Sequence, residues 1–162
     1  MIILIMGVCG VGKSTIGKQL SVALGAHFID ADDFHAEASR LKMQQGQALT
    51  DADREDWLAR LAAALASQAE GGDIVLACSA LKQAYRERLL QAKPKYLVVW
   101  LHGSSAMIAE RLHARRGHFM HPTLLDSQLA ILEPPLNAIH IRVDQSPSQI
   151  VAEILKFTRN RQ

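Results

Sequence analysis

The amino-terminal stretch restricts the possible folds most, because an apolar run leads directly into a glycine-rich loop. Residues 2–6 are all apolar, and the next eight are Gly7-Val8-Cys9-Gly10-Val11-Gly12-Lys13-Ser14. These eight residues match the pattern G-x-x-x-x-G-K-[ST]. Apolar residues then recur at helical spacing, at Ile16, Leu20 and Leu24. A buried strand, a glycine-rich turn and a helix in this order indicate a loop that binds phosphate groups.

The residue types in this loop suit phosphate binding. Glycine permits backbone angles that let successive N–H groups converge on phosphate oxygens. In such a loop the lysine, Lys13, reaches the β- and γ-phosphate oxygens, and the hydroxyl of Ser14 can ligate Mg²⁺. A helix that begins near Gly12 adds the positive end of its dipole. We therefore predict a nucleotide site made by Gly7, Cys9, Gly10, Val11, Gly12, Lys13, Ser14 and Thr15.

Length and composition favour one globular domain over residues 1–162. Apolar residues make up 49% of the chain, yet no segment approaches the roughly 18 consecutive apolar residues of a membrane span. Met1 leads straight into the first strand without the basic segment of an export signal. We therefore expect a cytoplasmic protein in which Cys9 and Cys78 are reduced thiols. The net charge of +2 is too small to indicate nucleic acid as a partner.

Five short segments are typical of strands, and most of them are continuous apolar runs. A strand that is buried on both faces has no polar face to alternate, so these runs predict a parallel sheet covered by helices on both sides. The expected architecture is α/β and doubly wound. The five predicted strands are residues 2–6, 27–30, 74–78, 96–102 and 138–143.

Capping patterns place two of the intervening helices. Thr50 with Asp53 three residues on predicts a capping box, and Ser146 with Gln149 predicts another. We expect the first of these helices to end at Gly71-Gly72. The most irregular stretch is residues 115–122, so we expect a mobile lid over about residues 112–123.

Two aspartates, Asp30 and Asp32, follow the second predicted strand. Ligands gather above the carboxyl edge of a parallel sheet, and side chains two apart in an extended segment point the same way. One carboxylate could hold Mg²⁺ through water, and the other could accept a bond or a proton from an attacking hydroxyl. The alternative is that Asp32 or Asp33 simply caps the next helix.

Basic residues after the third strand suit an anionic acceptor. Lys82, Tyr85 and Arg86 have spacings of three and four, which would put them on one face of a helix. This polar face suits a hydroxylated carboxylate, although it could also be a solvated surface. Arg54 is a further candidate, because a guanidinium can hold a carboxylate with two parallel bonds. The third strand ends in Ala77-Cys78-Ser79, without the acidic residue that motor NTPases usually carry there.

A second basic group contains Arg111, Arg115 and Arg116. One of these arginines could neutralise the charge that develops on the γ-phosphoryl oxygens during transfer. A structural pairing with Glu110 or Asp126 is the alternative. The nearby histidines, His118 and His121, lack partners at zinc-ligand spacing, so we expect them to be solvated.

Taken together, these residues resemble the gluconokinase family of small P-loop carbohydrate kinases. The resemblance extends from the phosphate loop to about Pro135. Its most specific parts are Cys78-Ser79-Ala80-Leu81-Lys82, Gly117-His118-Phe119 and Leu132-Glu133-Pro134. Four positions depart from the pattern that we expect, but none removes a charged group. These are Cys9 in place of serine, Ala31 in place of glycine, Ala36 in place of proline and Ser39 in place of asparagine.

The resemblance implies a P-loop NTPase fold like that of nucleoside and shikimate kinases. It also implies transfer of the γ-phosphate of ATP to the 6-hydroxyl of D-gluconate, with Mg²⁺ required, and a homodimer. Lys13, Asp32 and Arg115 become the catalytic residues, and Arg111 joins the ATP site. Ser14, together with Asp30 through water, becomes the Mg²⁺ site. The residues that would hold the substrate are Asp32, His35, Arg54, Ser79, Lys82, Arg86 and His118.

Two alternatives stay open at this stage. A kinase of another small acceptor, such as shikimate or a nucleoside monophosphate, would use the same scaffold. An aromatic content of 5% supplies few residues for stacking a nucleobase acceptor, whereas shikimate would suit Arg54, Lys82 and Arg86. The other alternative is a switch that binds a nucleotide without an acceptor. Guanine-nucleotide switches typically carry Asn-Lys-x-Asp, a motif that is absent from this sequence.

Overall fold

The computed structural model describes residues 1–68, 71–91, 95–114, 121 and 123–159. The five predicted strands are present and form one parallel sheet in the order β2-β3-β1-β4-β5. This arrangement confirms the predicted doubly wound α/β class, although β3 and β5 are slightly shorter than predicted. The strands are β1 (Ile2–Met6), β2 (His27–Asp30), β3 (Ile74–Ala77), β4 (Tyr96–His102) and β5 (Ile139–Arg142).

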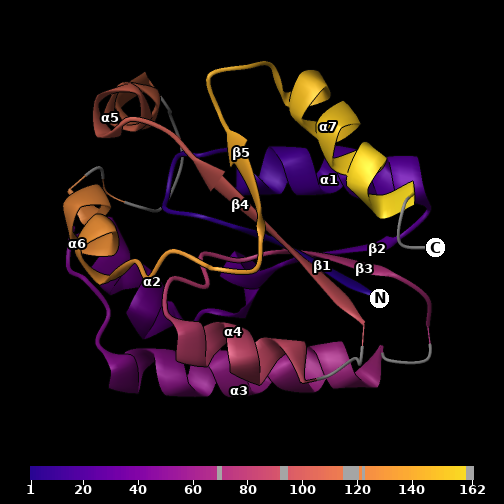
Figure 1. Ribbon diagram of the computed structural model, residues 1–162. Coiled ribbons are helices and arrows are strands. Elements are labelled where there is room, and N and C mark those ends of the chain that lie inside the picture. The colour runs from indigo at the N-terminus through magenta and orange to yellow at the C-terminus, as the bar shows by residue number, and fades with distance from the viewer. Residues whose placement is uncertain (69–70, 92–94, 115–120, 122, 160–162) are drawn as a thin grey trace.

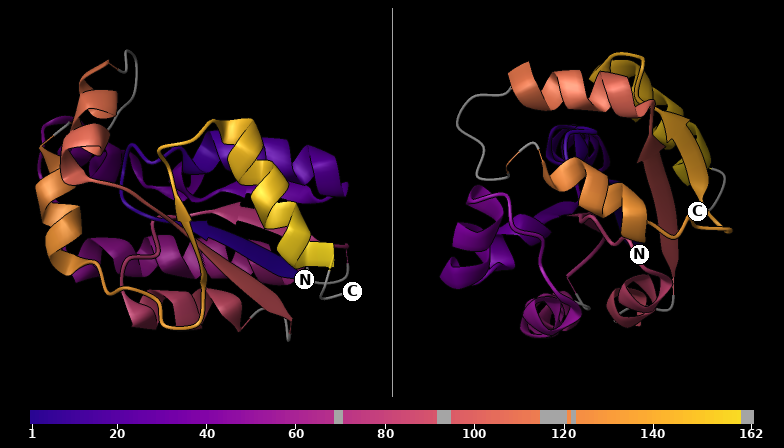
Figure 2. Two further views of the ribbon diagram at one scale, coloured as in Figure 1. Left: turned by 45° about the horizontal axis from the view of Figure 1, so that its top comes forward. Right: turned by 90° about the vertical axis from the view of Figure 1, so that its left-hand side faces the viewer.

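Helices cover both faces of the sheet (Figure 1). One face carries α1 (Lys13–Leu24) and α7 (Pro147–Arg159), and the other carries α3 (Asp51–Ser67) and α4 (Gln83–Leu90). The remaining helices stand at the end where the strands finish, which Figure 2 shows from two further directions. They are α2 (Glu37–Gln44), α5 (Ser105–Ala114) and α6 (Leu124–Ile131). A short 3₁₀ helix, η1 (Ala31–Phe34), follows β2.

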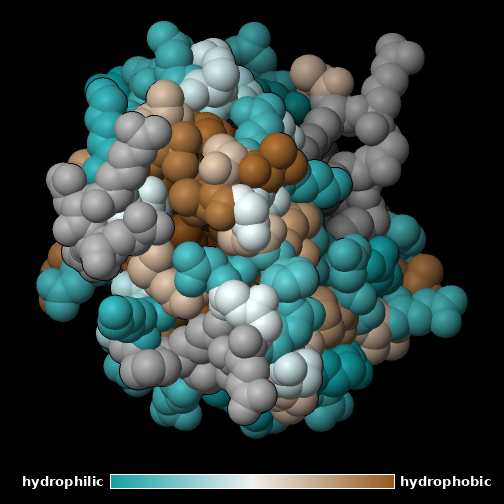
Figure 3. Space-filling model, turned by 90° about the vertical axis from the view of Figure 1, so that its right-hand side faces the viewer, coloured by the Kyte–Doolittle hydropathy of each residue, from teal (hydrophilic) through white to brown (hydrophobic). Residues whose placement is uncertain are grey.

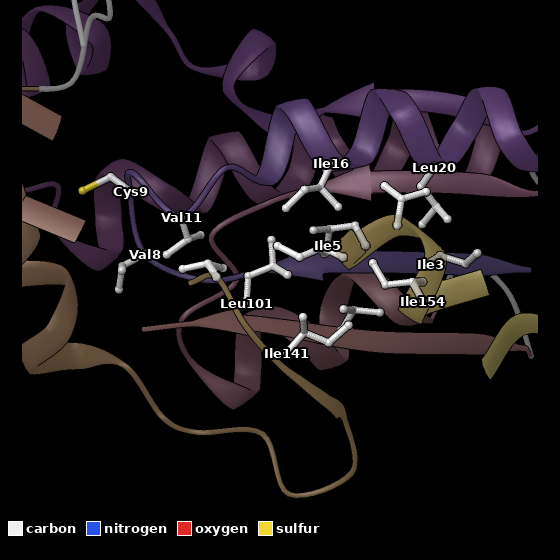
Figure 4. Packing of buried hydrophobic residues seen from close by; sticks show 14 of the residues in the cluster. Ile3, Ile5, Val8, Cys9, Val11, Ile16, Leu20, Leu101, Ile141 and Ile154 are labelled. Atoms are coloured by element: carbon white, nitrogen blue, oxygen red, sulfur yellow. The ribbon is translucent and has the colours of Figure 1, made fainter. Parts of the chain in front are cut away.

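The central strand β1 divides its side chains between two apolar cores. Ile3 and Ile5 pack with side chains of α1 and α7 on one face (Figure 4). Ile2, Leu4 and Met6 pack with α3 and α4 on the other face. All five side chains are fully buried. The phosphate loop therefore leaves the sheet from its most enclosed strand, which fixes the position of the loop.

Both predicted capping boxes are present. Asp53 N–H donates to Thr50 Oγ1 at the start of α3, and Thr50 N–H donates back to the Asp53 carboxylate. Ser146 and Gln149 exchange the same two bonds at the start of α7. The predicted end of α3 was wrong. The helix stops at Ser67, because the chain turns at Gln68, whose carbonyl accepts a bond from Gly71 N–H.

The predicted lid lies mostly outside the described residues. Of residues 112–123, the first three belong to α5. Residues 115–120 and 122 are not described. Within the parts of the chain that the structure describes, no helix is both long and apolar enough to cross a membrane.

The opposite end of the molecule, which Figure 3 faces, carries apolar surface among hydrophilic side chains. A wide pocket there is lined by residues at the amino ends of the strands and on α7, including Met1, Tyr96 and Phe157. None of the phosphate-loop residues lines this pocket. The chemistry suggested by the sequence therefore belongs to the other end of the sheet.

Candidate active site

The phosphate loop is tightly enclosed at two of its glycines. Gly7 has a φ of 146° and Gly10 a φ of 85°, angles that side-chain-bearing residues rarely adopt. A Cβ at Gly7 would lie 2.5 Å from the carbonyl oxygen of Leu101, and one at Gly10 would lie 2.8 Å from Leu112 Cγ. The predicted nucleotide residues from Gly7 to Thr15 therefore form one compact turn that runs into α1.

Lys13 is folded back over this loop. Its Nζ donates to the carbonyl oxygen of Val8 at 3.0 Å. The ammonium group of Lys13 thus lies over the loop, and the amino end of α1 faces the same place. This arrangement gathers backbone donors, a helix end and an ammonium group in one place, which suits a polyphosphate.

Asp30 connects the loop with the chain that follows β2. The Ser14 hydroxyl donates to Asp30 Oδ2 at 2.6 Å, and Asp32 N–H donates to Asp30 Oδ1 at 3.1 Å. Asp30 is therefore the residue that caps η1, rather than Asp32 or Asp33. The expected extended segment was also wrong, because residues 31–34 curl into a 3₁₀ helix as soon as Asp30 caps it.

The Asp32 carboxyl is partly buried close to the loop. Burial raises the pKa of Asp32 above its ordinary value, the charge of Lys13 lowers this pKa, and Asp30 raises it further. The backbone around Asp32 is held in place, since Trp57 Nε1 donates to the Ala31 carbonyl at 2.7 Å. Lys13, Asp30 and Asp32 thus form one electrostatic group, as the sequence predicted.

His35 lies beside this group against an aromatic ring. Its imidazole stacks on Trp57 with ring centroids 4.6 Å apart, and His35 Nε2 is 3.8 Å from Asp32 Oδ1. Burial, followed by the charges of Arg40 and Arg54, lowers the pKa of His35 to about 4. The imidazole is therefore neutral near pH 7 and can exchange hydrogen bonds with hydroxyl groups.

Three of the predicted substrate residues line one pocket at this end of the sheet. His35 comes from the end of η1, Arg54 from α3 and Ser79 from the turn after β3. Polar and apolar side chains thus line this narrow pocket together. The other lining residues are Met43, Ala48, Leu49, Trp57, Leu81, Leu124 and Gln128.

Lys82 and Arg54 share an acidic partner. Lys82 Nζ lies 2.9 Å from both carboxylate oxygens of Asp51, and Arg54 Nη1 is 4.0 Å from Asp51 Oδ1. The Tyr85 hydroxyl also donates to Asp51. These bonds, with that of Tyr85 contributing most, lower the pKa of Asp51. Two members of the predicted face, Lys82 and Tyr85, therefore meet around a carboxylate that sequence spacing did not indicate.

Arg86 does not belong to that face. Its side chain is buried, and Nη1 donates to the carbonyl oxygens of Ala80 and Leu81 at 2.9 and 3.1 Å. Nη2 donates to Gln83 Oε1 at 2.9 Å. The prediction that Arg86 shares a polar face with Lys82 and Tyr85 was wrong, because its buried guanidinium bonds to turn carbonyls. A contact between Arg86 and the substrate stays a prediction. Ala80 has a φ of 43°, so Arg86 helps to hold a strained turn between Ser79 and Lys82.

The predicted arginine group is only partly described. Arg111 Nη2 donates to the carbonyl oxygen of Val143, just after β5, and does not pair with Glu110 or Asp126 among the described side chains. Arg115 and His118 lie outside the described residues. Arg111 therefore joins α5 to the segment that leads into α7.

The oxygen donors near the loop fit a magnesium ion that takes most of its ligands from water and phosphate. The Ser14 hydroxyl and the Asp30 carboxylate are neighbours, and both are the oxygen donors that Mg²⁺ prefers. Among the described residues, no three His, Cys, Asp or Glu side chains gather as a metal cage. A cation held through water and phosphate oxygens requires only this small set of protein donors.

One site residue received no role from the sequence. Gln128 on α6 is buried, and its Oε1 accepts a bond from Cys9 N–H in the phosphate loop at 2.7 Å. The only sequence signal was the Ser127-Gln128 pair within the region of family resemblance. Its contact spans 119 positions of the chain, a separation that no local pattern can reveal.

Comparisons with known proteins agree with this geometry. The shikimate kinase family model matches residues 9–159. The chain is 46% identical to a probable gluconokinase of Rattus norvegicus over 96% of both chains. It is 43% identical to a gluconokinase of Arabidopsis thaliana, covering 98% of this chain and 93% of that one.

A solved structure gives the same result. A gluconokinase from Sinorhizobium meliloti 1021 superposes with a TM-score of 0.84 at 42% identity, over 95% of this chain and 89% of that one. These matches cover the phosphate loop, the pocket and both faces of the sheet. The chain therefore belongs to the gluconokinase family of small P-loop kinases, which is related to shikimate kinase.

Proposed function

We propose that this protein transfers the γ-phosphate of ATP to the 6-hydroxyl of D-gluconate, which yields 6-phospho-D-gluconate and ADP. One observation carries the proposal beyond family membership. The Ser14–Asp30 bond joins the phosphate loop to the segment that carries Asp32 and His35, and His35 lines the pocket that also contains Arg54. A phosphate tail and a polyhydroxy acid can therefore meet at Asp32.

Asp32 is the proposed acceptor for the hydrogen of the attacking hydroxyl. Burial raises its pKa toward the range of a useful general base, and the charge of Lys13 opposes this rise. Because phosphoryl transfer has a loose transition state, orientation of the hydroxyl contributes more than proton removal. The neutral His35 would accept or donate a bond to a neighbouring hydroxyl.

The carboxylate of gluconate would meet Arg54 and Lys82, with Ser79 bonding a hydroxyl. Asp51 already neutralises part of this charge, so the substrate carboxylate would compete with Asp51 for the same cations. This competition favours an acceptor whose anionic group can form two bonds with Arg54.

Lys13 and backbone N–H groups would hold the ATP phosphates, and Arg111 would belong to the ATP site. We also propose that Arg115 neutralises the transferred phosphoryl group and that His118 contacts the substrate. Mg²⁺, once held by Ser14 and by Asp30 through water, would supply positive charge to the phosphate oxygens. A cytoplasmic location and a homodimer complete the proposal.

A panel of acceptors tests the proposed reaction. ADP release is measured with D-gluconate, shikimate and a nucleoside monophosphate, each at saturating ATP and Mg²⁺. We expect kcat/KM for gluconate to exceed that for the other acceptors by at least about 10²-fold, because each acceptor presents a different set of hydrogen-bonding groups. The Lys13→Ala variant is the control for contaminating kinases. Equal or faster turnover of shikimate or the nucleotide would refute the gluconate assignment.

A further inference from the structure

Gln128 is held with its amide in one orientation. Cys9 N–H is a donor, so the oxygen of the Gln128 amide must face the phosphate loop. The amide nitrogen, Nε2, then points away from the loop, and within the described part of the chain the Gln128 side chain bonds only through Oε1. Gln128 also lines the pocket that contains His35, Arg54 and Ser79. An unused double donor thus belongs to a residue that touches both the loop and the pocket.

The helix that carries Gln128 is fixed at its start. His121 N–H donates to the carbonyl oxygen of Met43 at 3.1 Å, just before α6 begins. Leu124 in the first turn of α6 packs with Met43 and Leu49 in a small apolar cluster. The amino end of α6 is therefore tied to the segment around α2, which forms one wall of the pocket.

The same helix is fixed just beyond its end. Glu133 N–H donates to the carbonyl oxygen of Leu81 at 2.9 Å, and the Glu133 carboxylate accepts a bond from Gln83 N–H at 2.5 Å. These bonds join α6 to the turn before α4, which forms another wall of the pocket. Gln128 lies between the two anchored ends, so its position relative to the pocket is set by the surrounding fold.

We propose that Gln128 links acceptor binding to the phosphate loop. Its Nε2 donates to a hydroxyl or carboxylate oxygen of the bound sugar acid while its Oε1 holds Cys9 N–H. The acceptor is thereby aligned against the loop through a single planar amide. This assignment rests on the proposed function, and it names Gln128 as both a substrate-binding residue and a positioning residue for the loop.

Gln128→Glu is the sharpest test, because it keeps an oxygen for Cys9 N–H and removes the Nε2 donor. We expect the KM for gluconate to rise at least about 10-fold, while the KM for ATP stays within about two-fold. Loss of a donor and gain of a charge facing an anionic acceptor act in the same direction. Gln19→Glu, at an exposed position of α1, is the matched control for the added charge.

Gln128→Met tests the second half of the proposal. This variant removes both the donor and the acceptor, so we expect kcat to fall as well as the KM for gluconate to rise. Melting curves of both variants show whether the protein stays folded. If Gln128→Glu were unfolded, the KM for gluconate of Gln128→Met would decide, and an unchanged value would refute the contact between Gln128 and the acceptor.

The outcomes separate this inference from the proposed function. Wild-type protein that releases no ADP with gluconate would refute the proposed function itself. Wild-type activity together with an unchanged gluconate KM in Gln128→Glu would refute the role of Gln128 alone. Equal increases in the KM for ATP and the KM for gluconate would also refute it, because a purely structural side chain would affect both substrates alike.

Discussion

The partly buried carboxylate of Asp32 should affect catalysis and folding stability in opposite ways. Burial raises its pKa, which means that the ionised carboxylate is held at a cost to folding stability. The same carboxylate is the proposed hydrogen acceptor for catalysis. Activity and stability should therefore respond in opposite directions when its charge is removed.

Asp32→Asn should lower kcat by about 10²- to 10⁴-fold, the range for loss of a general base. It should also raise the melting temperature at pH 7, because a neutral amide replaces a desolvated charge. Steady-state kinetics and calorimetry check the two effects. Asp33→Asn, at the neighbouring exposed position, is the control and should leave both quantities near the wild-type values. A stable variant with near-normal kcat would remove Asp32 from the mechanism.

The pH dependence of kcat/KM should reflect the ionisation of Asp32. Asp32 must be ionised to accept a proton, so kcat/KM should fall as the pH drops through a pKa that lies above the ordinary 3.8. Lys13 and Arg40 oppose this shift, whereas Asp30 and Asp33 add to it. Since His35 has a pKa of about 4, it should add no transition near pH 6.5. A profile that is unchanged in Asp32→Asn would contradict this assignment.

Among the elements, α3 illustrates how a single carboxylate can serve two neighbours. Asp53 completes the capping box with Thr50, and its Oδ1 also accepts a hydrogen bond from Lys42 Nζ at 2.8 Å. The bond from Lys42 comes first among the interactions that lower the pKa of Asp53 to about 2. The start of α3 is thereby joined to α2, and both elements contribute to the acceptor pocket.

Asp53→Asn should destabilise the fold at neutral pH by about 2–4 °C in melting temperature. The folded-state pKa is depressed, so this stabilisation is complete above about pH 4 and is lost as the pH falls toward 2. Melting curves across this range check the expectation. Asp56→Asn, exposed on the same helix, provides the comparison. A difference between variant and wild type that persisted below pH 2 would count against the electrostatic explanation.

The turn held by Arg86 leads to another expectation at the level of elements. Arg86→Met removes the side-chain donor to the Ala80 carbonyl and one of the two donors to the Leu81 carbonyl, which should cost about 2 kcal/mol of unfolding free energy. Urea titration measures this loss. Intact stability combined with a 10-fold higher gluconate KM would instead return Arg86 to the substrate site.

Local patterns predicted the elements well and the contacts between them poorly. The strands followed from continuous apolar runs, and the starts of α3 and α7 followed from their capping residues. The position of Arg86 was misjudged because helical spacing gives a direction but not the depth of burial. Gln128 and Asp51 were missed because their partners come from other elements, whose placement depends on how the whole chain packs.

At the scale of the molecule, the sheet separates two functions. The phosphate loop shares its apolar core with α1, α5 and α7, whereas the acceptor pocket is built by η1, α2, α3, α6 and the turn after β3. Hydrogen bonds join the two parts at Asp30, at Gln128 and at Ser79, whose carbonyl oxygen accepts a bond from Gly7 N–H. Each ligand should therefore be able to stabilise the fold by itself.

Nucleotide binding should be visible in the absence of gluconate. ATP with Mg²⁺ at about 100 times its Kd should add about 2.7 kcal/mol to the unfolding free energy. Lys13→Ala should lose most of this increase, whereas Lys18→Ala, at an exposed position of α1, should keep it. Thermal-shift titration measures both. An equal response in the two variants would show that the nucleotide does not depend on the loop lysine.

The division made by the sheet also has a consequence for evolution and protein engineering. Mutations that reshape the wall around His35 and Arg54 lie apart from the core that supports the phosphate loop. Selection for a new acceptor alcohol should therefore accumulate changes in η1, α2 and α3 while α1 keeps its original sequence. A library of variants confined to those three elements would sample new acceptor specificities without disrupting the part of the protein that binds ATP.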